Sequence, residues 1–407
     1  PSRGLGSQSG EALAKKQKKG FPSIYLTTKK TRKPKMLTDK LTFFSNRVQY
    51  ELFPLIDSEL NDPILDKHYK VSTILEVIQI EHFIPSYFQF GRGRPQKSRI
   101  NIARAFLAKH ILNICTTSQM VHMLKVDKNL RYICGWFPGE RVPSESTFSR
   151  AFSEMSQSKI LEKVHEALVA DTYENHMVIH SARDSMPIPV REREVNKKEE
   201  KTKKDRYSKT NKEGKKISVC EYQALELEPL EALSAQLSKE CNIGKKTKPD
   251  GLSLCWRGYK LHMDVADGKL PISCILTSAS THDSQAAIPL SMMSSSRATV
   301  LYELMDSAYD VNAIKGYVKE KGRVPLVRTH KRKGQRKVLV ENNEKASKVL
   351  NWKPADERRL QHRFSNERLF ARLKDSFLGQ FVWVREHSKV MCHVMLGVLS
   401  LYASEIT

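Results

Sequence analysis

Two aspartates and one glutamate stand out because their surroundings suit a charged site. Asp184 ends the apolar run VIHSARD and Asp306 ends LYELMD, so we expect both at the ends of strands, where α/β sheets carry their sites. Glu367 lies in FSNERLFARLKDS, residues 364–376, which reads as a helix. The alternative for each aspartate is a structural cap on the helix that follows.

The glutamate shares one stripe of its predicted helix with two cations. Arg363, Glu367 and Lys374 lie within about 40° of one another at 3.6 residues per turn. An apolar arc borders this stripe, formed by Leu369, Phe370, Leu373 and Phe377. Glu367 could therefore look over the sheet toward both aspartates. The plainer reading is an Arg–Glu pair on a solvated face.

Three converging carboxylates would repel one another unless a divalent cation neutralised them. Mg²⁺ prefers carboxylate oxygen, water and substrate phosphate, so Asp184, Asp306 and Glu367 fit a phosphodiester site with two metal ions. We expect Mn²⁺ to substitute. Arg363 and Lys374 would then contact the flanking phosphates.

Other polar residues have structural readings that we favour. Asp310 rivals Asp306 but is expected to cap the next helix, and His282-Asp283 is expected to cap the helix that starts at 283. His262 reads as a structural or DNA-facing histidine. Trp256, Trp352 and Trp383 could stack on a base but more often belong to a core or an interface. The seven cysteines contain no C-x-x-C pair, which argues for reduced thiols and against zinc.

The charge of the chain indicates a polyanionic partner. Among 407 residues, 69 Lys and Arg face 45 Asp and Glu, which gives a net charge of +24. Nucleic acid is the leading candidate, with double-stranded DNA as the expected partner, and an acidic membrane surface is the other candidate. No apolar run approaches the roughly 20 residues of a membrane span, and no secretory signal is seen, so we expect no membrane partner. The phosphate-binding pattern G-x-x-x-x-G-K-[ST] is missing, so we expect no nucleotide cofactor.

The elements that would position these residues fall into three regions. Residues 1–36 read as a basic flexible tail, 37–170 as a helical DNA-binding or dimerisation region, and 171–407 as a catalytic α/β domain with a mixed sheet. Five strands are predicted, at 177–185, 256–266, 269–280, 298–309 and 324–330. Helices are predicted at 283–293, 310–321, 356–378 and 387–405. A basic insertion at about 191–250 should carry one helix at 221–240.

Several cations are candidate DNA contacts. GRGRPQK (91–97) could lie in a minor groove, although a basic turn before the next helix is the reading we favour. PSESTFSRAF and the preceding TTSQMVHMLKV could form a helix-turn-helix. The candidate contacts are Arg92, Arg94, Arg150, Lys260 in GYKLH, and Arg328, Lys331 and Arg332 in RTHKRKGQRK.

The order of the motifs resembles the DDE transposases of bacterial insertion sequences. The chain has Asp184, then GYKLH (258–262), SASTHDS (278–284), DSAYD (306–310) and R-x₃-E-x₆-K ending at Lys374. The resemblance implies an RNase H-like catalytic domain, a metal-binding triad of Asp184, Asp306 and Glu367, and DNA contacts by Arg363 and Lys374. Leu360 stands where one large group of the family has a tyrosine.

The resemblance also implies a function. We expect a transposase that cleaves the terminal inverted repeats of its own element and joins the 3′ ends to target DNA by transesterification. A homodimer on DNA and a location in the bacterial cytoplasm, at the nucleoid, are implied as well. The alternatives are a domesticated or inactive DNA-binding protein and a stand-alone RNase H-like nuclease.

Overall fold

The computed structural model describes residues 64–85, 96–137, 139–195, 208–210, 216–226, 229–247, 251–328 and 355–407. The predicted tail at 1–36 and the helical pattern at 41–56 lie outside these ranges, as does most of the basic insertion between 196 and 215. The three predicted regions and their boundaries stay a prediction.

Helices make up the first part of the described chain. They are α4 (Asp66–Ile78), η2 (Ile80–His82), α5 (Arg99–Ile111), α6 (Thr117–Val126), α7 (Lys128–Ile133), α8 (Glu145–Ser158) and α9 (Ile160–Tyr173). Local capping explains where some begin: the Ser98 hydroxyl accepts the Asn101 N–H at the start of α5, and Thr116 and Gln119 form a capping box on α6. The predicted helix-turn-helix is wrong in its connection, because α7 and residues 134–144 separate α6 from α8.

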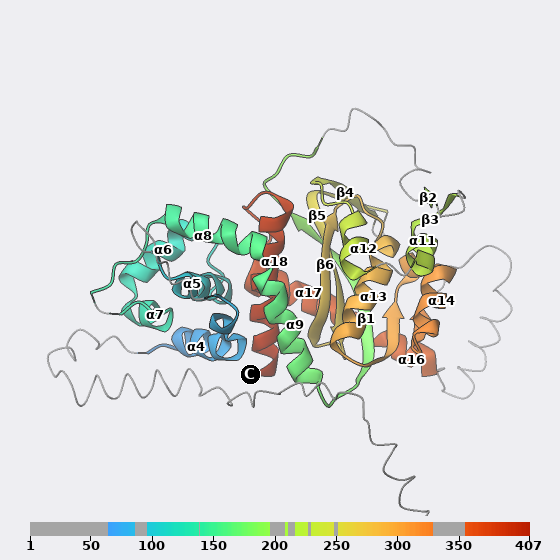
Figure 1. The fold of residues 1–407 in the computed structure, drawn as a ribbon, viewed down its shortest axis with the longest axis horizontal. Coiled ribbons are helices and arrows are strands. Elements are labelled where there is room, and N and C mark those ends of the chain that lie inside the picture. Colours follow the sequence, from blue (N-terminus) through green and yellow to red (C-terminus); the bar gives the residue numbers. More distant parts are fainter. Residues whose placement is uncertain are drawn as a thin grey trace, which may run out of the picture.

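A mixed six-stranded sheet forms the second part (Figure 1). Its order is β4-β5-β1-β7-β8, with β6 also paired to β5. The strands are β1 (Val178–Pro189), β4 (Asn242–Thr247), β5 (Ser253–Ala266), β6 (Leu270–Ser278), β7 (Val300–Met305) and β8 (Val324–Val327). Strand β1 runs antiparallel to β5 and parallel to β7. A short hairpin, β2 (Ser208–Thr210) with β3 (Lys216–Ser218), stands apart from it.

The five predicted strands are confirmed, and β4 was missed. One expectation about β1 is wrong: Asp184 lies inside the strand and not at its end, because residues 185–189 continue the pairing with β5 up to Pro189 opposite Gly258. Gly258 has a φ of +145°, and a Cβ there would lie 2.3 Å from the Ile188 carbonyl oxygen. Glycine therefore permits the close approach that lets β1 continue past the aspartate.

The helices beside the sheet differ in detail from their prediction. The run 221–240 forms two short helices, α11 (Val219–Glu226) and α12 (Leu230–Gln236), since Pro229 starts the second. Helix 283–293 is η3 (Asp283–Ala286) followed by α13 (Ala287–Arg297), and 310–321 is η4 (Ser307–Tyr309) followed by α14 (Asn312–Glu320). The predicted helix at 356–378 is divided into α16 (Ala355–Gln361), α17 (Phe364–Leu373) and the π-helical turn η5 (Lys374–Leu378).

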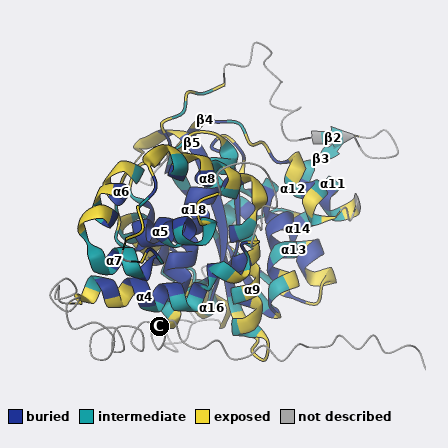
Figure 2. Cartoon of the chain, turned by 60° about the vertical axis from the view of Figure 1, so that its left-hand side comes forward, coloured by how far each residue is buried: buried dark blue, intermediate teal, exposed yellow. Residues whose placement is uncertain are grey.

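Helix α18 (His387–Ile406) joins the two parts of the molecule. It packs against α4, α5, α8 and α9 on one side and against β6 on the other, and Figure 2 shows it buried at the centre. Its 20 residues have a mean hydropathy of 1.3 over their most apolar window, enough in length and composition to cross a membrane, but 72% of that window is buried. The expectation that no apolar run approaches 20 residues is therefore wrong, because a helix enclosed on several sides is apolar all round.

Candidate catalytic site

Asp184 and Asp306 stand at matching positions on neighbouring parallel strands. Ala182 on β1 pairs with Leu304 on β7, and each aspartate lies two residues further along its chain. Asp306 directly follows β7 and caps η4, where its Oδ1 accepts the Ala308 N–H at 2.8 Å. The capping alternative is thus confirmed for Asp306, and it does not remove this carboxylate from the site, because no described residue hydrogen-bonds its Oδ2.

The environment of Asp184 disfavours a bare negative charge. Burial raises the pKa of its carboxyl group from 3.8 to about 6, and the charge of Asp306 acts in the same direction. The Ser185 N–H, which donates to Asp184 Oδ1 at 2.8 Å, and the Arg363 guanidinium oppose this rise. A buried carboxyl group whose pKa is raised by burial and by a neighbouring acid is typical of a functional site.

Arg363 supplies a positive charge to the first aspartate. It stands at the N-cap position of α17, and its Nη1 donates to Asp184 Oδ2 at 3.1 Å, with both side chains largely shielded from solvent. In this structure the guanidinium is bound to a carboxylate of the site. Its predicted contact with DNA phosphate stays a prediction.

Helix α17 is tied to β1 by the residue before the glutamate. Asn366 is fully buried, and its Nδ2 donates to the Ala182 carbonyl oxygen at 2.8 Å, two residues before Asp184. The predicted apolar arc of Leu369, Phe370, Leu373 and Phe377 is buried as expected. Glu367 follows Asn366 on the exposed side of the helix.

The structure therefore brings together Asp184, Asp306 and Arg363, but it does not close a triad with Glu367. Within the described ranges, no three Asp, Glu, His or Cys side chains gather closely enough to hold a metal ion. The two aspartates nevertheless fit a hard divalent cation in their chemistry, since both offer carboxylate oxygens and the burial of Asp184 favours a cationic partner. The triad stays a prediction.

The charge of Lys246 acts on Asp184 and on Lys374. Lys374 opens the π-helical turn after α17, and burial lowers the pKa of its ammonium group, with Asp375 opposing and Lys246 adding to this shift. Lys246, an exposed residue of β4, also lowers the pKa of Asp184. The sequence reasoning missed Lys246 because KKTK was read as part of the basic insertion; the only signal was the short run NIGKKT before a turn.

Lys260 and His262 on β5 point into the fold. Lys260 Nζ donates to the Thr281 carbonyl oxygen and to Asp283 Oδ1, both at 2.8 Å, so nothing here supports its predicted DNA contact. His262 is completely buried and hydrogen-bonds Thr277 Oγ1 through Nε2 at 2.9 Å, and burial lowers its pKa to about 4. It is structural, and the DNA-facing reading is wrong.

The capping expectations around these motifs hold only in part. His282 caps η3, where its Nδ1 accepts the Ser284 N–H, but the Asp283 side chain pairs with Lys260 instead of capping. Asp310 does not cap α14 either, because Val311 is its N-cap residue and Asp310 pairs with Lys315. This correction leaves Asp310 committed to a lysine and Asp306 as the better second aspartate.

A buried charged network lies beneath the site. Arg183, the neighbour of Asp184, is 1% exposed and donates through Nε and Nη2 to the two oxygens of Asp264, at 2.8 and 2.7 Å. Its Nη2 also lies 3.1 Å from Glu303 Oε2, and Arg323 pairs with the same glutamate. Because strand side chains alternate, Arg183 faces this network while Asp184 faces the site.

Tyr309 adds a buried donor beside the carboxylates. Its hydroxyl is buried and has no hydrogen-bond partner among the described residues. Burial raises its pKa well above the usual range, and the charges of Asp283, Asp184 and Asp306 act in the same direction. The tyrosine of DSAYD therefore lies close to the acidic group, which sequence reasoning had not assigned to it.

The other predicted contacts are scattered. Arg150 is exposed on α8, and Arg328 is exposed after β8, where its N–H donates to the Met305 carbonyl oxygen at 3.1 Å, next to Asp306. Trp256 is buried, which favours its core reading, and Trp383 is 55% exposed beside Phe381. The residues outside the described ranges are Arg92, Arg94, Lys331, Arg332 and Trp352.

The described fold is therefore a helical region followed by a mixed sheet, in a chain of net charge +24, with two neighbouring aspartates on the sheet. Two family models match the chain: one described as Transposase domain (DUF772) over residues 56–154, and one described as Transposase DDE domain over 217–402. The chain belongs to the DDE transposases of insertion sequences. The second match contains Asp306 and Glu367, whereas Asp184 precedes it. Comparison with curated proteins and with solved structures gives no match.

Proposed function

We propose that this transposase cleaves DNA at the terminal inverted repeats of its own insertion sequence and joins the freed 3′ ends to target DNA. The observation that carries the proposal is that Asp184 and Asp306 stand at matching positions, each two residues beyond a paired residue of the neighbouring strands β1 and β7. Arg363 donates a hydrogen bond to Asp184. Cleavage hydrolyses a phosphodiester with water and frees a 3′ hydroxyl, and joining then exchanges one phosphodiester for another, so neither step needs energy from a nucleotide cofactor.

The side chains of the site have separate roles in this proposal. Asp184, Asp306 and Glu367 would hold Mg²⁺, or Mn²⁺ in its place, as two ions, and the bound cations would supply Lewis-acid stabilisation of phosphate charge. The Arg363 guanidinium lowers the pKa of the buried Asp184 carboxyl group and so favours its ionised form before a cation binds. Lys374, Lys246 and the exposed Arg328 contribute positive charge where a phosphate backbone would approach.

Glu367 has to approach the aspartates for this role. Its helix is bounded by irregular backbone at both ends, because α16 and α17 are separated before it and the π-helical turn interrupts regular helical bonding after it. Binding of DNA and metal would draw the exposed glutamate over β1, with Asn366 as the fixed point.

The wider assignment rests on the same core. The order β6-β5-β1-β7-β8, three antiparallel strands followed by two parallel ones, supports an RNase H-like catalytic domain. We further propose that the helical region reads the element ends, that two ends are handled by a homodimer, and that the protein works in the bacterial cytoplasm at the nucleoid.

The test is cleavage and joining of labelled DNA that carries the repeats flanking the gene. Wild type should nick at the repeat boundary and form joined products with Mg²⁺ or Mn²⁺ and form neither with EDTA. Glu367→Gln should lose both by at least about 10³-fold while binding DNA normally. Glu357→Gln, an exposed glutamate of α16, is the matched control and should retain activity.

Each alternative function gives a different result. Nicked DNA without joined products from wild type would favour a stand-alone nuclease. Binding without any metal-dependent product would favour an inactive DNA-binding protein. Full activity of Glu367→Gln would remove this glutamate from the site.

A further inference from the structure

The π-helical turn η5 directly follows α17, the helix that carries Glu367. It begins about two helical turns after the glutamate. A π turn bonds a carbonyl oxygen to the amide five residues further on, and the Lys374 carbonyl oxygen accepts the Gly379 N–H at 2.9 Å in this way. Gly379 leaves the helical path with a φ of +75°. The later carbonyls of the turn therefore need donors from outside the helix.

Two of these donors come from α5. His110 lies in the last turn of that helix, is 3% exposed and hydrogen-bonds the Phe377 carbonyl oxygen through Nδ1 at 2.8 Å. A carbonyl oxygen only accepts, so Nδ1 must carry the hydrogen atom. Asn113, two residues after α5, donates from Nδ2 to the Asp375 carbonyl oxygen at 2.8 Å. The end of α5 thus holds the turn at two points.

Helix α18 supplies a third donor and packs closely on the turn. His393 hydrogen-bonds the Leu378 carbonyl oxygen through Nε2 at 3.2 Å, and its ring centroid lies 4.4 Å from that of His110. Gly397 leaves room for the Leu378 side chain, since a Cβ at this position would lie 2.4 Å from Leu378 Cδ2. Phe377 and Leu378 are buried, so the turn is enclosed between α5 and α18.

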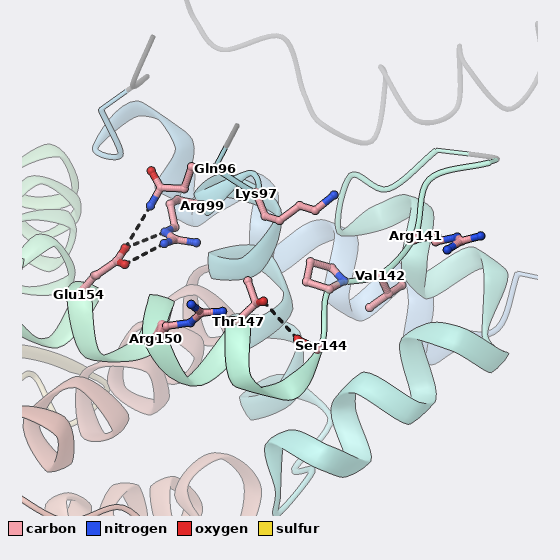
Figure 3. A pocket seen from close by; sticks show the side chains of 10 residues that line it. Gln96, Lys97, Arg99, Arg141, Val142, Ser144, Thr147, Arg150 and Glu154 are labelled. Carbon is pink, nitrogen blue, oxygen red and sulfur yellow. Dashed lines mark hydrogen bonds and ion pairs between the residues drawn. The ribbon is translucent and has the colours of Figure 1, made fainter. Parts of the chain in front are cut away.

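Helix α5 is itself a fixed support. At its start, Arg99 donates to Glu154 of α8 from Nε at 2.7 Å and from Nη2 at 2.8 Å, as Figure 3 shows. Further along, the ring of Phe106 lies 5.7 Å from that of Phe148, also on α8. Helix α5 lies in the segment that matches the first transposase model, whereas η5 lies in the segment that matches the second. The bonds to η5 therefore join the two matched segments.

We propose that His110, Asn113 and His393 are positioning residues for the proposed reaction. By holding η5 in its π-helical form, they fix the direction in which α17 presents Glu367. This inference rests on the proposed function, which gives that glutamate a role in the site. Asn366 ties the start of α17 to β1, and the three donors tie its end to α5 and α18.

Two physical effects make the form of this turn matter. A π turn holds one residue more than an α turn between bonded groups, so a change to the α form would rotate α17 by up to about 100° relative to the chain after it. Loss of a donor also leaves a carbonyl of the π form unpaired in the interior, which favours such a change. A displacement of about 1 Å at a reacting group can cost on the order of 100-fold in rate.

Cleavage of a labelled repeat end by the full chain with Mg²⁺ tests the inference, with kcat and KM for the DNA measured separately. His110→Leu removes the donor, and kcat should fall by about 10- to 100-fold while KM stays within about 2-fold, because this buried residue cannot reach DNA. His110→Asn supplies an amide donor and should return kcat to within about 3-fold of wild type. A smaller side chain leaves a cavity, so a role in packing alone predicts the larger loss for His110→Asn.

A second variant tests the same turn from the surface. Asn113 is exposed, and Asn and Asp both tolerate its left-handed backbone, with a φ of +51°. In Asn113→Asp the carboxylate cannot donate to the Asp375 carbonyl oxygen, so kcat should fall by about 3- to 10-fold, the equivalent of one hydrogen bond. Asn312→Asp makes the same change at an exposed position of α14 and should leave kcat within about 2-fold of wild type.

The outcomes separate this inference from the proposed function. Unchanged kcat in both His110→Leu and Asn113→Asp, with an active wild type, would overturn the positioning role alone. A kcat for His110→Asn no higher than that of His110→Leu would assign the histidine to packing. A wild type that forms no cleaved product would reject the proposed function and this inference with it. Hydrogen exchange without DNA or metal should be faster at the η5 amides in His110→Leu than in His110→Asn, and equal exchange would contradict the holding of the turn.

Discussion

Asp184 is buried next to a second acid, and a single arginine balances it. The pKa of its carboxyl group rises to about 6 through burial, while Arg363 and the Ser185 N–H work against the rise. A carboxylate in this state gains more from a bound cation than a solvated one does, because it has already lost its water. The neighbouring residue, Arg183, points to the opposite face of the sheet, where it forms ion pairs with Asp264 and Glu303.

The choice between Asp306 and Asp310 can be decided by one pair of variants. Asp306→Asn should reduce metal-dependent cleavage by at least about 10³-fold, because it would remove a proposed metal ligand that stands beside Asp184. Asp310→Asn removes the partner of Lys315 and should leave cleavage within about 3-fold of wild type. Rates on a labelled repeat end give the comparison, and a larger loss for Asp310→Asn would reverse the assignment.

Helix α17 is the element that determines where the third carboxylate lies. Its start is separated from α16 by two residues, and its end passes into a π-helical turn, so it is short and held at defined points. The Asn366 bond to Ala182 fixes the helix against β1 near the first aspartate. The predicted stripe of Arg363, Glu367 and Lys374 assumed one regular helix over 356–378. In the structure Arg363 precedes α17 and Lys374 starts the π-helical turn, so only Glu367 of the three lies inside α17.

Removing the anchor of α17 should uncouple the glutamate from the sheet. Asn366→Ala deletes a buried hydrogen bond and leaves the Ala182 carbonyl oxygen unpaired, so the free energy of unfolding should fall by about 1–3 kcal/mol. Cleavage should fall further than duplex affinity does. Gln361→Ala, at an exposed position of α16, should change neither quantity. Urea unfolding with a parallel cleavage assay tests this, and unchanged stability of Asn366→Ala would contradict the anchoring role.

The whole molecule is held together around α18 and several buried histidines. His393 on α18 lies 4.4 Å from His110 of α5, ring to ring, and His165 of α9 hydrogen-bonds the Pro271 carbonyl oxygen at 2.8 Å. Burial lowers the pKa of His393 and His165 to about 3 and that of His262 to about 4. Their lowered pKa values favour the neutral form in the folded protein, and the bond from His165 to Pro271 links helix α9 to strand β6.

Mild acid should therefore destabilise the fold. Between pH 6.5 and about 4 the unfolded chain binds protons at these histidines and the folded chain does not, so stability falls as the pH falls. Each histidine contributes up to about 1.4 kcal/mol per pH unit. Asp184 acts in the opposite sense between about pH 4 and 6, because its folded pKa is raised, but it is one group against three.

Thermal unfolding at pH 7.5, 6.0 and 5.0 measures this effect. The unfolding temperature should drop steadily, and His393→Gln should lessen the pH dependence because one titrating group is gone. His122→Gln, at an exposed position of α6, serves as the control and should leave the dependence as in wild type. A stability that stays constant from pH 7.5 to 5.0 would argue that these histidines are accessible to protons.

Local patterns were enough to predict much of this protein. The five strands and the apolar face of α17 follow from residue periodicity, since side-chain spacing is set by backbone geometry. Net charge and motif order indicated a DNA-acting transposase, and the family matches agree. Each of these inferences needs only neighbours in the chain.

Tertiary structure decided the rest, because it depends on pairing between distant segments. Only the register of β1 with β7 shows that the aspartates stand side by side, and only the packing of Asn366 on Ala182 places α17. The motif GYKLH predicts Lys260 as a DNA contact, but in the folded chain its ammonium group donates to Asp283, 23 residues away. Lys246 reaches the site for the same reason, since the packing of β4 and not its local sequence brings its charge to Asp184. Tyr309 differs, because it lies in the η4 turn that Asp306 caps.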